Sequence, residues 1–144
     1  MRALLDTSVL IALLDASHVH HSLVAQWLPK HAARGWASCP ITLNGCIRIM
    51  SQPQYPNRVP LHEVVQGLAQ AMQSPLHEFW PDDVNTVLTQ SINWDFTLRS
   101  AQLTDAYLLA LAVAHKGRLV TLDKGIPLSC VRQAKPEALV VLGH

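Results

Sequence analysis

The chain carries little charge for its length. Only 15% of its 144 residues are Asp, Glu, Lys or Arg, against about 25% in an average globular protein. The 11 basic and 10 acidic residues leave a formal net charge of +1, so the protein has no strong overall field to attract nucleic acid or a membrane surface. Because 49% of the residues are hydrophobic, the composition also excludes an intrinsically disordered chain.

Long hydrophobic runs and cysteine pairs are also lacking. The longest apolar stretches, such as 9–14 and 106–114, are too short to span a bilayer. An acid at position 6 comes too early for a signal peptide. The three cysteines form no CxxC pair, which favours reduced thiols. We therefore expect a cytoplasmic protein without membrane segments, folded as a single domain over residues 1–144.

Short apolar segments alternate along the chain with segments of helical spacing. The predicted strands are 3–5, 36–39, 76–79, 118–123 and 138–142. The predicted helices are 9–14, 20–33, 40–50, 61–73 and 84–92, followed by one that Thr104 caps. Such alternation predicts an α/β fold in which helices flank a central parallel sheet.

Acidic residues are few, and three of them occupy apolar segments. The chain has seven Asp and three Glu. Asp6 follows the first predicted strand, Asp123 ends the fourth, and Asp105 opens the last helix. In an open parallel sheet these positions face one crevice, where ligands bind. Since burying an unpaired carboxylate costs several kcal/mol, such a cluster needs a cation, hydrogen bonds or a proton.

A divalent cation with oxygen ligands would hold these three carboxylates together. Mg²⁺ suits a sparse cluster because it keeps most of its waters, and metals held in this way activate water for phosphodiester hydrolysis. Each acid also has a simpler interpretation, Asp105 as a first-turn acid and Asp6 and Asp123 as turn residues. Turn residues have no reason to gather at one end of a sheet, so the joint pattern favours the metal site.

The segments around these acids resemble the motifs of the PIN-domain nucleases, and within them the VapC toxins of bacterial toxin–antitoxin pairs. The segments are Leu4–Ile11, Pro40–Ile49, Thr104–Ala112 and Leu119–Asp123, in the order and at the spacing of that family. The resemblance implies a PIN-like three-layer sandwich, dependence on Mg²⁺ or Mn²⁺, and cleavage of RNA. It also implies a homodimer and a small VapB-like antitoxin bound over the active site.

The same resemblance implies roles for individual residues. Asp6 and Asp105 would be the metal ligands, and Asp123 would complete the catalytic cluster. Thr121 or Ser8 would support these acids through hydrogen bonds.

The second motif departs from the family pattern. A Glu is usual there, and this chain has Leu43 in its place. The adjacent Asn44 is polar, but its amide carries no charge and cannot act as a base. Arg48, in the same motif, is our candidate for binding an RNA phosphate.

Three functions remain open on these grounds. The first is a metal-dependent endoribonuclease, the toxin of a toxin–antitoxin pair. The alternative is a catalytically weak PIN-like module that binds RNA or an antitoxin, because Leu43 replaces an acid. An aspartyl-phosphate phosphatase is disfavoured, since Ser8 stands where that class has its second Asp.

Overall fold

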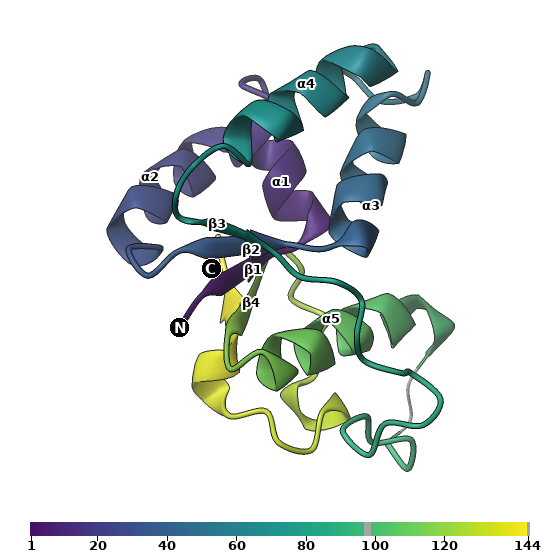
Figure 1. The fold of residues 1–144 in the computed structure, drawn as a ribbon. Helices are drawn as coiled ribbons and strands as arrows, with labels where there is room; N and C mark the ends of the chain where they lie inside the picture. Colours follow the sequence, from purple (N-terminus) through teal and green to yellow (C-terminus); the bar gives the residue numbers. More distant parts are fainter. Residues whose placement is uncertain (97–98, 144) are drawn as a thin grey trace.

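The computed structural model describes residues 1–96 and 99–143, and one five-stranded parallel sheet organises them (Figure 1). The strands are β1 (Ala3–Leu5), β2 (Trp36–Ser38), β3 (His77–Phe79), β4 (Arg118–Thr121) and β5 (Leu139–Val141). Their order is β3-β2-β1-β4-β5, and every neighbouring pair is parallel. Each strand lies within the segment that the sequence predicts for it, so the expected α/β class is confirmed.

Helices cover both faces of this sheet. They are α1 (Thr7–Leu14), α2 (His21–His31), α3 (Pro40–Met50), α4 (Leu61–Ala71) and α5 (Leu103–Ala114). The first four lie on one face and α5 lies on the other, which gives the expected three layers (Figure 1). Within the described ranges, no helix is both long and apolar enough to cross a membrane.

The strands supply one hydrophobic core to each face. Leu4 and Leu119 pack toward α5, whereas Leu5 and Val120 pack toward α1, α3 and α4. All four side chains are fully buried. Successive residues of a strand point to opposite faces, so strands that are apolar throughout can serve two cores. This burial on both faces explains why β1 and the centre of β4 show no polar alternation.

The predicted helix at 84–92 is wrong. This segment forms turns, and the Asn85 side-chain oxygen accepts hydrogen bonds from the backbone amides of Val87 and Leu88, each at 3.1 Å. Such a local bond competes with helix formation. Val87 is 84% exposed and Leu88 73% exposed, so burial of apolar side chains gives this segment no support for a helix.

The first turn of α5 also differs from the expected one. A 3₁₀ turn at Ser100–Gln102 leads directly into the helix, which begins at Leu103. Thr104 therefore lies inside the first turn and does not cap it. Asp105 still falls in that first turn, as the sequence predicts.

Candidate active site

The order in which the chain adds strands to the sheet reverses between β1 and β4. The chain adds β2 and β3 on one side of β1, then crosses the other face through α5 to place β4 on the opposite side. Ligands of open α/β sheets bind outside the carboxyl ends of the strands at such a switch point. Asp6 follows β1 and Asp123 lies two residues beyond β4, so both belong to this place.

Asp6 joins β1 to α1. It is the N-cap of α1, and its Oδ1 accepts a hydrogen bond from the Thr7 amide at 2.7 Å. Its own amide donates to the Val120 carbonyl of β4 at 2.9 Å. These bonds to the helix and to the neighbouring strand fix the carboxylate, which is only 8% exposed.

Thr121 connects Asp6 to Asp123. Its hydroxyl donates to Asp6 Oδ2 at 2.7 Å and accepts from the Asp123 amide at 3.0 Å. Thr121 is fully buried, so this hydroxyl has no competing water. Ser8 supports the same turn from the other side, because its Oγ accepts a long bond of 3.4 Å from the Leu122 amide. Both hydroxyls therefore shape the strand end that carries Asp123.

Asp105 faces the other two acids. Burial raises its pKa to about 6, and the charges of Asp6 and Asp123, together with a hydrogen bond to Asp123, contribute to that rise. Burial also raises the pKa of Asp6, although the bonds from Thr121 and the Thr7 amide oppose this. The structure thus brings the three predicted acids close enough for their charges to repel.

The second motif contributes less to the cluster than the resemblance implies. Leu43 lies on α3 and lines an apolar groove with Ile47 and with residues of α4. Asn44 and Arg48 are exposed on the same helix. The carboxylate that is usual in this motif therefore has no counterpart on α3.

The donor set at the acids fits a divalent cation with few protein ligands. No group of three or more His, Cys, Asp or Glu among residues 1–96 and 99–143 has the geometry of a metal cage. Mg²⁺ is normally held by one or two carboxylates and keeps several waters. Asp6 and Asp105, two carboxylates with raised pKa values beside a third acid, match that requirement.

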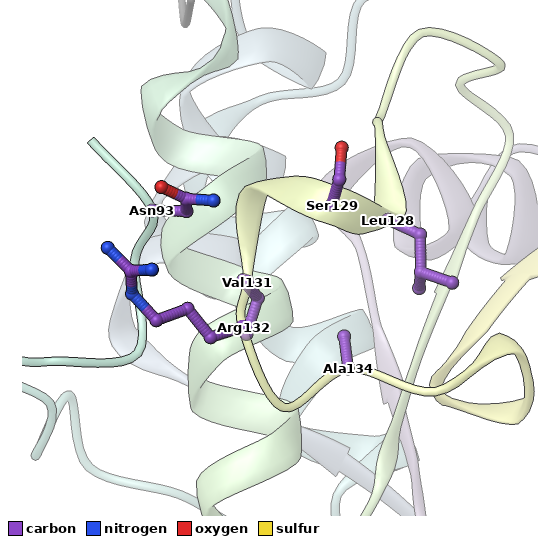
Figure 2. A pocket seen from close by; sticks show the side chains of 6 residues that line it. All are labelled: Asn93, Leu128, Ser129, Val131, Arg132 and Ala134. Carbon is purple, nitrogen blue, oxygen red and sulfur yellow. The ribbon is translucent and has the colours of Figure 1, made fainter. Parts of the chain in front are cut away.

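An open pocket of about 710 Å³ lies elsewhere on the α5 side of the sheet (Figure 2). Asn93, Ser129 and Arg132 line it together with apolar side chains. None of the three acids lines it. Asn93 and Arg132 belong to segments that pair through the bridge between Ile92 and Val131. This hollow is therefore separate from the acid cluster.

One acid at the same edge of the sheet was not predicted as a functional residue. Asp82 follows β3 by three residues, and burial raises the pKa of its carboxyl group. Asp82 precedes the segment 84–92, for which the sequence wrongly predicts a helix. The rule that selects Asp6, an acid just beyond a buried apolar strand, does not select Asp82, because β3 is largely exposed and two residues separate it from Asp82.

Comparison with known proteins gives a consistent result. The profile of the PIN domain matches residues 3–128. Ribonuclease VapC44 of Mycobacterium tuberculosis is 46% identical over 142 residues, which are 99% of this chain and 100% of that protein.

Two solved structures share the fold. One is M. tuberculosis VapC20, described as a toxin that cleaves the sarcin–ricin loop. Its TM-score is 0.57 at 13% sequence identity, and the match covers 81% of this chain and 85% of the VapC20 chain. The other is VapBC2 of Rickettsia felis bound to a DNA fragment from its promoter, with a TM-score of 0.57, 14% identity, and coverage of 99% and 100%. At these identities the two structures support the fold alone.

Since the PIN profile covers most of the chain and the similarity to VapC44 is full-length, this chain belongs to the PIN-domain family and, within it, to the VapC ribonucleases.

Proposed function

We propose that this chain is a metal-dependent endoribonuclease and the toxin of a toxin–antitoxin pair. One observation carries the proposal: Asp6, Asp105 and Asp123 meet at the switch point of the sheet, and Thr121 joins two of them by hydrogen bonds. Full-length similarity to a protein named a ribonuclease supports RNA as the substrate.

Asp6 and Asp105 are the proposed ligands of Mg²⁺, with Mn²⁺ as a substitute. A bound divalent ion supplies an activated water and offsets negative charge on the phosphoryl oxygens. The two carboxylates would orient it. Asp123 adds a third negative charge, which raises the pKa of Asp105 and also attracts a doubly charged ion. When water attacks the phosphorus, the P–O3′ bond breaks and the departing 3′ oxygen takes up a proton. The products carry a 5′-phosphate and a 3′-hydroxyl.

The remaining site residues are proposed either to position the acids or to contact the RNA. Thr121 holds the Asp6 carboxylate in one orientation, so the carboxylate need not reorganise when it binds an ion. Ser8 and Thr121 together fix the backbone that carries Asp123. Arg48 and Asn44, exposed on α3, are proposed to contact the phosphates of the RNA strand.

Partners and location follow from the same proposal. A VapBC complex among the structural neighbours supports a small VapB-like antitoxin as the partner of this chain. We also propose a homodimer and a cytoplasmic location, where RNA is present. All three cysteines are buried and unpaired, as expected of a protein in a reducing compartment.

The decisive experiment replaces Asp6 by Asn and measures RNA cleavage with Mg²⁺. Asp6→Asn keeps the shape of the side chain and removes its charge, so cleavage and toxicity should fall by at least about 100-fold while circular dichroism is unchanged. Asp95→Asn is the matched control, because it removes the same charge from a side chain that is 96% exposed. Cleavage by Asp6→Asn at the rate of Asp95→Asn would refute the assigned role.

A second candidate function has one observation in its favour. Leu43 lines an apolar groove at the position where the resemblance to the family implies an acid. A chain without that acid would bind RNA or an antitoxin but cleave poorly. RNA binding that is indifferent to EDTA, with no products at saturating Mn²⁺, would favour this binding module over the nuclease.

A further inference from the structure

A pocket of about 330 Å³ opens beside the acid cluster, between the start of α3, the loop after β3 and the first turns of α5. Its walls are apolar, from Ile41, Val84 and Leu103, and its polar groups include Asp82 and Tyr107. Its volume is at the lower end of the range for small-molecule pockets. It therefore suits one ring system and not a whole nucleotide.

Tyr107 brings an unused hydroxyl to this pocket. The residue is 6% exposed, and within the described chain its Oη has no hydrogen-bond partner of normal geometry. The Val84 amide lies near enough to oppose the rise in the pKa of Tyr107 that burial and the charge of Asp82 cause. Even if that amide donates, the phenolic proton has no acceptor. A buried donor left unpaired is costly, which points to a ligand that accepts from it.

Asp82 supplies an acceptor at the pocket mouth. Its side chain is exposed and lines the pocket. A carboxylate offers about four acceptor positions for hydrogen bonds. The pocket thus offers an exposed acceptor and a buried donor, and its walls are apolar.

The pocket lies within reach of a strand held at the acids. Asp6 follows β1, whereas Ile41 and Asp82 of the pocket follow β2 and β3. These three strands are neighbours in one parallel sheet, so the acids and the pocket share its carboxyl edge, where adjacent strands lie about 4.8 Å apart. Figure 1 shows the loop after β3 running past the N-terminal end of α5. A single-stranded RNA whose phosphate lies at the acids can therefore place a neighbouring base against Asp82.

We propose that this pocket binds a guanine base next to the cleaved phosphate and thereby selects the cleavage site. The proposal rests on RNA being the substrate. Guanine carries two adjacent donors, N1–H and the 2-amino group, which match the Asp82 carboxylate, and its O6 can accept a hydrogen bond from the Tyr107 hydroxyl. Adenine and cytosine present a ring nitrogen acceptor in place of N1–H, which a carboxylate repels. Single-stranded RNA is commonly read through such base edges.

The test uses binding, so that it does not depend on catalysis. Uridine heptamers with one central guanosine, inosine or adenosine are bound to the Asp6→Asn protein and followed by fluorescence anisotropy. We expect the guanosine heptamer to bind about 10-fold more tightly than the adenosine heptamer, with inosine between them because it lacks the 2-amino group. Asp82→Asn should reduce this preference to about 2-fold or less, since an amide replaces one of the two acceptors with a donor.

Two further variants separate base recognition from structural effects. Tyr107→Phe removes only the unpaired hydroxyl, so thermal stability should be kept while the guanosine preference falls about 3-fold or more. Asp83→Asn is the matched control, because Asp83 pairs with His115 and does not line the pocket. It should keep the full preference.

The possible outcomes are distinct. Equal binding of the three heptamers, or a preference that survives both Asp82→Asn and Tyr107→Phe, would overturn the proposal. An intact preference with loss of neutralisation by a co-expressed antitoxin in Asp82→Asn would assign the pocket to a protein partner instead. If the proposed nuclease function failed, the wild-type chain would cleave none of the heptamers while the binding preference remained. Cleavage without base preference would mean that the pocket assignment alone is wrong.

Discussion

Thr121 Oγ1 lies 2.7 Å from Asp6 Oδ2, although 115 residues separate them in the chain. The contact exists because β1 and β4 are neighbours in the sheet and are paired in register, with Leu5 opposite Val120. Asp6 and Thr121, the next residues on the two strands, therefore lie side by side. This register brings two segments that are distant in the sequence into one site.

Thr121→Val should separate the role of this hydroxyl from the shape of its side chain. Valine has nearly the same shape but leaves Asp6 Oδ2 and the Asp123 amide without their partner. We expect a loss of about 1–3 kcal/mol in the free energy of unfolding and a clear fall in kcat for RNA cleavage. Thr121→Ser keeps the hydroxyl and should retain most of both. If Val and Ser variants cleave RNA equally well, the hydroxyl does not support the site.

Divalent ions should stabilise the folded protein through the acids. An ion that binds only the native state at 100 times its Kd adds about 2.7 kcal/mol of stability. Mg²⁺ or Mn²⁺ should therefore raise the Tm of the wild-type chain, and EDTA should reverse the effect. Asp6→Asn should show a much smaller rise, while Asp95→Asn should behave as wild type. An equal rise in all three proteins would place the ion elsewhere.

Gly45 sets how closely α3 approaches the start of α1. A Cβ at this position would lie 2.8 Å from Thr7 Oγ1 and 3.1 Å from Thr7 Cγ2, next to Asp6. Gly→Ala inside a helix normally stabilises by roughly 0.5–1 kcal/mol, but Gly45→Ala should destabilise and lower activity because Thr7 must move.

Gly67→Ala is the control for this substitution. Its Cβ would meet Leu14 at an ordinary contact distance of 3.5 Å, so the variant should gain stability in urea unfolding. A gain at both glycines would show that the α1–α3 contact is not tight.

Asp15 should make stability depend on acid pH. It is 8% exposed at the end of α1. Burial alone would raise its pKa, but hydrogen bonds from Tyr55, the Ser17 amide and Asn57 outweigh it, so the pKa of Asp15 lies below its usual value. A carboxyl with a lowered folded pKa adds stability that is complete above the unfolded pKa of about 3.9 and is lost as pH falls through the folded pKa.

Urea unfolding of Asp15→Asn and wild type at pH 7 and pH 3 checks this prediction. Wild type should be more stable by about 2 kcal/mol at pH 7, and the difference should shrink at pH 3. A difference that is the same at both pH values would mean that the charge of Asp15 contributes nothing.

The predictable part of this fold is the part that local sequence determines. The strand segments 3–5 and 118–121 have apolar centres and an acid just beyond their ends, and Pro40 begins α3 as a first-turn proline should. Together with the switch-point rule, these features bring Asp6 and Asp123 together before any coordinates are known.

What the sequence did not predict depends on long-range packing. The segment 84–92 forms turns and not the predicted helix, and Val87 is 84% exposed. The pairing of Asp15 with Tyr55 joins residues 40 positions apart. The unpaired Tyr107 hydroxyl becomes visible only when its neighbours are placed. None of these leaves a periodic or compositional signal.

The central claim is that a divalent ion sits between acids from different parts of the chain. The most direct measurement is an anomalous difference map from a crystal of the wild-type chain soaked in Mn²⁺. The account predicts a peak within coordination distance of Asp6 and Asp105, absent from crystals of Asp6→Asn. A cleavage-competent crystal form with no peak there, or with its only peak away from Asp6, would contradict it.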